Sequence, residues 1–267
     1  MKLIMLGTGH ATVTKMYNGC FVLNEGDEYF LVDGGGGNTI LSQMEKASID
    51  WKEIQTIFVT HKHLDHLMGI LWIVRMICQF KRKGEHHKEV KIYACEEVIT
   101  LIELFTKKLL LEAEACFLNS GITLIPVSDK DEHSILQKKI IFFDIQSTKA
   151  IQYGFCMEIE KNKRFTFLGD EPYRSCEYPY ADKCDWLLHE AFCLYSERDK
   201  YHPYKINHST VKDACKIASQ LQVKNLILYH TEDKYLEQRS KLYEEEGRAY
   251  YNGNLFIPND LDVIDIL

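Results

Sequence analysis

Four side chains able to bind a metal ion lie within six residues of one another, in the segment Thr60-His61-Lys62-His63-Leu64-Asp65-His66. Neutral imidazole and carboxylate are ligands that suit zinc, manganese or iron. In an extended segment, His61 and His63 point to the same side. A turn after them would carry Asp65 and His66 to the opposite side of a shared cavity. The alternative is a chance polar turn, which so dense a cluster of histidines argues against.

Further polar residues follow strand-like runs later in the chain. Asp170 comes after the run Arg164–Leu168, and His230 comes after the run Asn225–Leu228. Taken singly, such a histidine is more often a structural residue whose hydrogen bonds are satisfied. Four glycines at 34–37 could cradle a phosphate, but glycine-rich turns are too common to indicate one.

The H-x-H-x-D-H segment resembles the metal motif of the metallo-β-lactamase superfamily, and the resemblance continues in order along almost the whole chain. Leu31-Val32-Asp33-Gly34-Gly35 resembles the family's strand-end Asp-Gly segment, which orients that motif. Within the superfamily the chain is most similar to ribonuclease Z, an endonuclease that trims tRNA 3′ ends. His189-Glu190-Ala191-Phe192 and His208-Ser209-Thr210 resemble its H-E-A-T and H-S-T segments.

The resemblance implies a centre of two metal ions. The ligands that it assigns are His61 and His63 for the first ion, Asp65, His66 and His230 for the second, and Asp170 as the bridge between them. The expected cofactor is one or two Zn²⁺ ions, with Mn²⁺ or Fe²⁺ as alternatives. Two such ions about 3.5–4 Å apart can hold a hydroxide at neutral pH and stabilise the leaving oxyanion of a phosphoryl or carbonyl substrate.

Asp65 and His208 are the expected catalytic residues. Asp65 could accept the proton of the nucleophile. The resemblance implies that His208 contacts the scissile phosphate and donates a proton, and an imidazole pKa near 6.5 suits that role. His189 is expected only to orient a metal ligand.

The chain departs from the family pattern at the third histidine of the first ion. The corresponding segment, residues 143–155, reads FDIQSTKAIQYGF and contains no histidine. Gln146 is the best positional substitute, and its carbonyl oxygen is a weaker donor to zinc than an imidazole nitrogen. We therefore expect the first ion to bind more loosely than the second. His86, His87 and His133 are more distant alternatives, and a solvated surface is the simpler interpretation of each.

A second departure concerns the substrate. Ribonuclease Z usually grips tRNA with a Gly/Pro-rich basic arm, whereas residues 81–145 contain one proline, two glycines and a helical pattern. The formal charge of −7 argues against a large polyanionic partner. The basic stretch Lys81–Lys91 is better explained as a solvated loop than as a phosphate contact. A small-molecule or RNA phosphodiester is therefore the expected substrate, and tRNA is doubtful. The resemblance also implies a homodimer.

Strand-like and helical patterns that could position these residues recur along the chain. The expected strands are Lys2–Leu6, Gly19–Leu23, Tyr29–Val32, Ile54–Thr60, Ile122–Val127, Ile140–Ile145, Tyr153–Ile159, Arg164–Leu168, Trp186–Glu190, Asn225–His230, Leu255–Ile257 and Val263–Ile266. The expected helices are Met68–Phe80, Glu97–Asn119, Ser209–Leu221, with His208 or Ser209 as N-cap, and Lys234–Glu246. This order predicts an α/β (α+β) fold, a four-layer αββα sandwich of two mixed β-sheets flanked by helices. No linker or repeat divides the chain, so residues 1–267 are predicted to form a single domain.

Composition places the chain among ordinary globular proteins, with 46% hydrophobic and 27% charged residues. The apolar stretch after Lys2 is shorter than the roughly 7–15 residues of a signal peptide core. The run Gly69–Phe80 is shorter than the roughly 18 residues that span a bilayer. These features predict a cytoplasmic protein without a membrane segment. Nine cysteines without paired spacing are expected to be reduced, mostly buried thiols.

The leading functional hypothesis is a metal-dependent hydrolase, either a phosphodiesterase or a ribonuclease Z-like endoribonuclease that uses a metal-bound hydroxide. One alternative is a hydrolase of a thioester, lactone or lactam on the same fold. Another is a catalytically weakened metal-binding protein that lost activity with the third histidine. The H-S-T histidine and the segment Phe167–Pro172 favour phosphate, and retention of Asp170 and His230 argues against complete loss.

Overall fold

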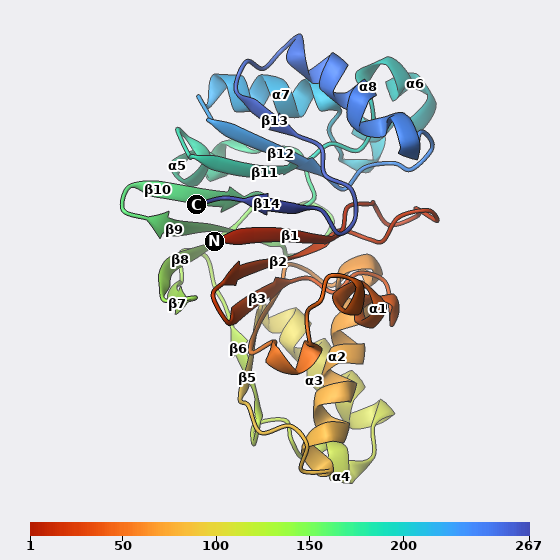
Figure 1. Cartoon of the computed structure of the whole chain (residues 1–267), viewed down its shortest axis with the longest axis vertical. Helices are drawn as coiled ribbons and strands as arrows, with labels where there is room; N and C mark the ends of the chain where they lie inside the picture. The colour runs from red at the N-terminus through yellow and green to blue at the C-terminus, as the bar shows by residue number, and fades with distance from the viewer.

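The strands form two mixed sheets of seven strands each (Figure 1). The computed structural model describes residues 1–267. The first sheet, in the order β14-β1-β2-β3-β4-β5-β6, consists of β1 Lys2–Gly7, β2 Cys20–Glu25, β3 Glu28–Val32, β4 Thr56–Val59, β5 Val90–Ala94, β6 Ile122–Pro126 and β14 Val263–Asp265. The second, in the order β13-β12-β11-β10-β9-β8-β7, consists of β7 Glu132–Ile135, β8 Lys138–Asp144, β9 Tyr153–Glu160, β10 Lys163–Phe167, β11 Trp186–Glu190, β12 Asn225–Tyr229 and β13 Asn254–Phe256.

Helices flank both sheets. On the first sheet, α1 Thr39–Lys46 contacts β1, α2 Leu64–Arg82 contacts β4, α3 Glu96–Leu109 contacts β5 and β6, and α4 Glu112–Ala115 packs on α2 and α3. On the second, α5 Tyr178–Ala181 contacts β9, α7 Val211–Gln220 contacts β11 and β12, and α8 Leu236–Arg248 contacts β13 and α7. The remaining turns are α6 Arg198–Tyr201, η1 Trp51–Glu53, η2 Ser175–Glu177, η3 Tyr195–Glu197 and η4 Pro203–Ile206. The predicted sandwich of two mixed sheets flanked by helices is confirmed (Figure 1).

Aromatic side chains fill the space between the two sheets. Phe58 on β4 packs against Phe142 on β8, with ring centroids 4.6 Å apart. Phe155 on β9 lies 5.6 Å from Phe30 and 6.0 Å from Phe58, ring centroid to ring centroid. Such alternating inward residues are what holds two packed sheets together.

A second apolar cluster lies between the second sheet and its helices. On β11, Leu187 belongs to this outer cluster, whereas Leu188 belongs to the core between the sheets. Ala214 and Cys215 of α7 pack into the outer cluster. Successive residues of a strand point to opposite faces, and this alternation also decides which residue at the end of β11 faces the site.

Two sequence expectations for helices were wrong. The helix expected over Met68–Phe80 begins earlier, at Leu64, and places Asp65 and His66 in its first turn. Leu64 is 72% exposed, so no apolar periodicity marked that start. The helix expected over Glu97–Asn119 stops at Leu109 and resumes as α4. The leucines that carried its apparent periodicity there are exposed, Leu109 by 70% and Leu111 by 61%.

Other elements lay outside the expectations. The basic stretch 81–91 is not only a loop, since its end forms the start of β5, and α1 and β7 had no predicted counterpart. Helix α7 is capped by Thr210, not by His208 or Ser209, through a hydroxyl that accepts from the N–H of Asp213. No helix in the structure combines the length and apolar character that crossing a bilayer requires.

Candidate metal centre

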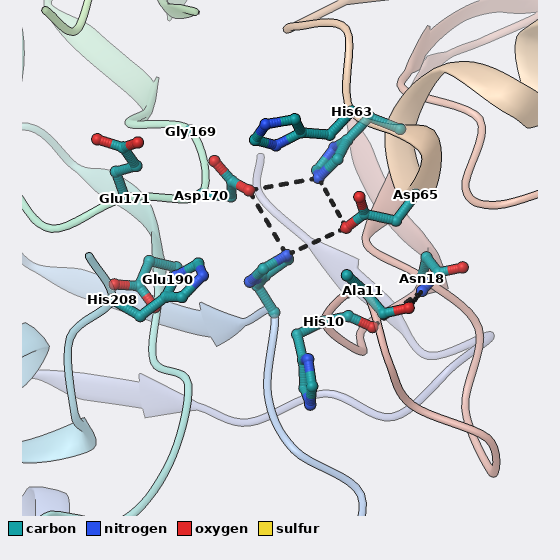
Figure 2. Close-up of polar contacts among 12 residues, drawn as sticks. His10, Ala11, Asn18, His63, Asp65, Gly169, Asp170, Glu171, Glu190 and His208 are labelled. Carbon is teal, nitrogen blue, oxygen red and sulfur yellow. Dashed lines mark hydrogen bonds and ion pairs between the residues drawn. The ribbon is translucent and has the colours of Figure 1, made fainter. Parts of the chain in front are cut away.

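The predicted metal ligands lie where parallel strands of both sheets end. β4 leads to His61 and to the first turn of α2, β10 leads to Asp170, and β12 leads to His230. β3 and β4 run parallel, as do β10, β11 and β12. Because parallel strands end at the same edge of a sheet, residues far apart in the chain meet there (Figure 2).

Four donor atoms form a closed ring at this edge, which we call the ligand ring. Nε2 of His66 lies 3.3 Å from Oδ2 of Asp65 and 3.4 Å from Oδ2 of Asp170. Nε2 of His230 lies 3.7 Å and 3.6 Å from the same two oxygens. Two ligands of one tetrahedral ion with bonds of about 2.0–2.2 Å lie roughly 3.3–3.6 Å apart. The distances from His66 and His230 to the two carboxylates are therefore close to those between ligands of a shared divalent ion.

Hydrogen bonding within the ring supports the same conclusion. Nε2 of His66 and Nε2 of His230 are buried and have no hydrogen-bond partner. Buried polar atoms are nearly always paired in proteins. A divalent ion between these nitrogens and the two carboxylates would satisfy them all, so the residues present fit a metal ion.

Asp33 fixes the orientation of His66. Nδ1 of His66 donates to Oδ2 of Asp33 at 2.7 Å, and the carboxylate also accepts from the N–H and the hydroxyl of Thr60, both at 2.8 Å. A proton held on Nδ1 leaves the lone pair of Nε2 directed at the ligand ring. The Asp-Gly segment thus lies against the metal motif, as the sequence indicated.

Two of the donor atoms expected to hold the first ion lie closer together than two ligands of one ion do. Nε2 of His61 lies 3.7 Å from Oδ2 of Asp170, within the same cluster as His66. Nδ1 of His63 lies 2.7 Å from Nε2 of His61, a hydrogen-bond distance. This is shorter than the roughly 3.3 Å between two ligands of one ion, so His63 must move slightly before both nitrogens can bind the same metal.

The structure does not bring Gln146 into the cluster, which corrects the sequence expectation. Gln146 is exposed, has a φ of 55°, and uses its N–H to bond Oδ1 of Asp144. Gln152 lies there instead: it is 1% exposed, and its Nε2 donates to Oδ1 of Asp170 at 2.6 Å. Positional counting missed this because the left-handed turn at residue 146 redirects the segment.

Charges around the ring favour a cation. Burial alone would lower the pKa of His66, but Asp65, Asp33 and Asp170 raise it well above its usual value. Burial alone would raise the pKa of Asp170, but His61, His66 and His230 hold it well below its usual range. The three buried carboxylates Asp33, Asp65 and Asp170 therefore favour positive charge at the ligand ring.

A second cluster of titratable groups joins the ligand ring at His230. Donor atoms of Glu190, His208 and His230 lie within 4.8 Å of one another. Nδ1 of His208 is 3.6 Å from Oε2 of Glu190 (Figure 2). Burial opposes protonation of His208, but the neighbouring Glu190 outweighs it and raises the pKa of His208. His208 can therefore carry a proton beside the metal ligands.

Glu190 is the main site residue that sequence reasoning missed. Its carboxylate is fully buried and accepts from the N–H of Ser209 and the N–H of Phe192. His189, which was expected to orient a metal ligand, instead bonds the backbone oxygen of Glu190 at 2.6 Å. Because Leu187 faces outward and Leu188 faces inward along β11, residue 190 and not residue 189 faces the site, and the apolar run Trp186–Leu188 does not show this alternation in the sequence.

His10 also lies beside the metal centre. Its ring lies 4.5 Å from that of Phe192 and 6.3 Å from that of His230, centroid to centroid. Burial, with the neighbouring His230 and His208, lowers the pKa of His10 to about 4, so it is neutral near pH 7. No sequence motif pointed to it.

Two mixed sheets flanked by helices, with a His/Asp centre at their common edge, define a metal-dependent hydrolase of the metallo-β-lactamase fold. The family model described as Anti-Pycsar protein Apyc1 matches residues 1–250, and the chain belongs to this family.

Similar proteins agree with the fold. Ribonuclease Z of Thermococcus sibiricus is 26% identical over 306 residues, covering 99% of this chain and 96% of that protein. Among solved structures, the metallo-β-lactamase fold protein YhfI from Bacillus subtilis superposes with a TM-score of 0.77 at 16% identity, covering 99% of both chains. The short form of human tRNase Z superposes with a TM-score of 0.76 at 21% identity, covering 100% of both chains.

Proposed function

We propose that the protein is a Zn²⁺-dependent phosphodiesterase. The ligand ring of Asp65, His66, Asp170 and His230 would hold one ion, and His61 and His63 would hold a second together with Asp170. When bound, such ions supply a nucleophile at neutral pH and polarise a phosphoryl oxygen. The spacing of the ring and its two unpartnered imidazole nitrogens support this assignment.

The observation that carries the phosphodiester assignment is that His208, paired with Glu190, lies next to the ligand ring. The oxygen that leaves a phosphodiester becomes an alkoxide, whose conjugate acid is about as weak as water, with a pKa near 15.7. It needs a proton as the bond to phosphorus breaks. His208 is buried and lies 5.2 Å from His230 between ring centroids, and Glu190 raises the pKa of His208 against the effect of burial, which favours its protonated form. A thioester, in contrast, releases a thiol with a pKa near 8.5, which leaves readily without an acid.

Asp65 would serve both as ligand and as proton acceptor. Burial opposes its ionisation, but His66 and His230 lower the pKa of Asp65, so it stays a carboxylate. Its position in the first turn of α2 adds the favourable field of the helix N-terminus.

The class of phosphodiester follows from charge and shape. The ribonuclease Z relatives support an RNA substrate. The charge of −7, and helices α3 and α4 where a basic arm would be expected, favour a small phosphodiester over tRNA.

We also propose that residues 1–267 act as one domain. The core between the sheets includes Leu3 near the N-terminus and Ile266 near the C-terminus. β14 pairs with β1, which joins the two ends of the chain in one sheet.

A substrate panel tests the function. Wild type and the variants Asp65→Ala and His208→Ala would be assayed with bis-p-nitrophenyl phosphate, precursor tRNA, a thioester and a chromogenic β-lactam, each with Zn²⁺ or Mn²⁺. We expect metal-dependent turnover of bis-p-nitrophenyl phosphate that is lost in Asp65→Ala. His208→Ala should lose about 10²–10⁴-fold on a dinucleotide phosphodiester added to the panel, whose leaving group is an alkoxide, and much less on bis-p-nitrophenyl phosphate, whose nitrophenolate leaves without an acid. Turnover of the thioester or lactam alone would contradict the proposal. Inactivity of the wild type on every substrate would favour a weakened metal-binding protein.

A further inference from the structure

One cation beside the site has no role in the function proposed above. Lys149 lies in the irregular segment between β8 and β9, and its side chain is 27% exposed. Its Nζ donates to the backbone oxygen of Ile206 at 3.3 Å and lies 3.6 Å from Oε1 of Glu171. Ile206 is two residues before His208, and Glu171 directly follows Asp170, so the ammonium group stands beside both parts of the site.

The segment that carries Lys149 is built to hold it there. The hydroxyl of Ser147 accepts from the N–H groups of Lys149 and Ala150, at 3.1 Å and 3.3 Å. The same hydroxyl donates to Oε1 of Glu171 at 2.7 Å. Because Glu171 is 1% exposed and adjoins Asp170, the segment is tied to the strand end that carries the bridging carboxylate.

The charge of Lys149 is not cancelled by its surroundings. Glu171 is the carboxylate nearest to it, but Oε2 of Glu171 already pairs with Arg174 at 2.8 Å and accepts from Asn207 at 2.6 Å. Glu171 therefore divides its charge between Lys149 and Arg174 and balances Lys149 only in part. An ammonium group has three N–H donors, and the two contacts of Lys149 leave one for a ligand.

We propose that Lys149 binds a non-bridging oxygen of the substrate's phosphodiester, and that it selects for anionic over neutral substrates. This proposal rests on the proposed phosphodiesterase function. The role suits the position: a phosphodiester keeps one negative charge throughout the reaction, and a lysine contacts it as a point charge. A thioester or lactone has no such charge.

The test compares Lys149→Gln, which removes the charge but keeps most of the length, with Lys149→Arg, which keeps the charge. Lys241→Gln is the matched control, because Lys241 is 79% exposed and pairs only with Glu245 on α8. Kinetics with bis-p-nitrophenyl phosphate and inhibition by inorganic phosphate would be measured at saturating Zn²⁺. Bound metal would be measured in every variant.

We expect Lys149→Gln to raise KM for bis-p-nitrophenyl phosphate and the inhibition constant of phosphate about tenfold, with unchanged metal content. Lys149→Arg should stay within about threefold of wild type, and Lys241→Gln should match it. An unchanged phosphate inhibition constant in Lys149→Gln, or an equal loss in Lys149→Arg, would overturn the proposal.

Calorimetric titration with inorganic phosphate separates this proposal from the proposed function. Phosphate binding weakened in Lys149→Gln would support the role of Lys149 even if no phosphodiester is hydrolysed. Equal binding by wild type and Lys149→Gln, or no binding by wild type, would refute it even if bis-p-nitrophenyl phosphate is a substrate.

Discussion

Nδ1 of His66 donates a hydrogen bond of 2.7 Å to Oδ2 of Asp33, which joins the end of β3 to the first turn of α2. This bond holds a proton on Nδ1 of a ligand-ring histidine, so that Nε2 is the nitrogen that gives up its proton and binds the metal. Asp33 does not belong to the ring, so its effect on metal binding can be tested separately from that of the ligands.

Replacing Asp33 with Asn should weaken the tighter metal site about 10–100-fold, because the amide cannot hold the proton on Nδ1 as a carboxylate does. Competition with a chromophoric zinc chelator measures this affinity. Asp27→Asn, at an exposed position, is the control and should bind like wild type. Unchanged affinity in Asp33→Asn would show that the bond does not orient the ligand.

Zinc should bind in two steps of unequal affinity. The ligand ring offers four donors, whereas the first ion has only His61, His63 and the shared Asp170. The first ion has fewer ligands, and two of them are hydrogen-bonded to each other. We therefore expect zinc to bind there at least about tenfold more weakly than at the ligand ring. Titration calorimetry on metal-free protein would resolve the two steps, and two equal steps would contradict the prediction.

Gln146→His tests the placement of residue 146. Because Gln146 is exposed and lies in a left-handed turn, a histidine there should change the weaker zinc affinity by less than about threefold. Gain of a tighter second step in this variant would mean that the segment can reach the first ion.

The pH profile of kcat/KM should depend on Glu190. Glu190 raises the pKa of His208, and the acid is active while protonated, so activity is present below that pKa and is lost as the pH rises through it. Glu190→Gln removes the charge and should move the alkaline limb to lower pH. Glu158→Gln, at an exposed position on β9, should leave the limb in place. An unmoved limb in Glu190→Gln would exclude this control of His208.

The inter-sheet core should dominate stability. Phe155 is fully buried among aromatic rings of both sheets, and Phe155→Ala should cost about 3–5 kcal/mol of the free energy of unfolding. Leu109→Ala, at a side chain 70% exposed, should change it by less than about 0.5 kcal/mol. Urea denaturation monitored by circular dichroism measures both, and similar losses would contradict the packing described.

The sequence predicted the sandwich because the strand-like runs and the order of the motifs agree along the whole chain. Local spacing was less informative where the chain turns. The sequence did not predict the start of α2 at Leu64. The first residues of this helix are an exposed leucine and two polar metal ligands, so they do not show the apolar periodicity of a helix. Exposed Leu109 and Leu111 suggested helix where the chain breaks.

Site residues could be inferred where a motif ends a strand, as for His230. Those brought in by tertiary structure could not. Gln152 was passed over for Gln146 because the positive φ at residue 146 is invisible to a count of positions. Glu190 could not be distinguished from His189, because the apolar run Trp186–Leu188 does not show which face of the strand points inward. Lys149 depends on contacts with Glu171 and Ile206, which no local pattern encodes.

Anomalous diffraction from crystals soaked in Zn²⁺ tests most directly whether the ligand ring is a metal site. We expect a zinc peak within about 2.0–2.2 Å of Nε2 of His66, Nε2 of His230 and the Oδ2 atoms of Asp65 and Asp170. A ring without a peak at saturating Zn²⁺, or zinc bound only elsewhere, would contradict the metal centre and the hydrolysis derived from it.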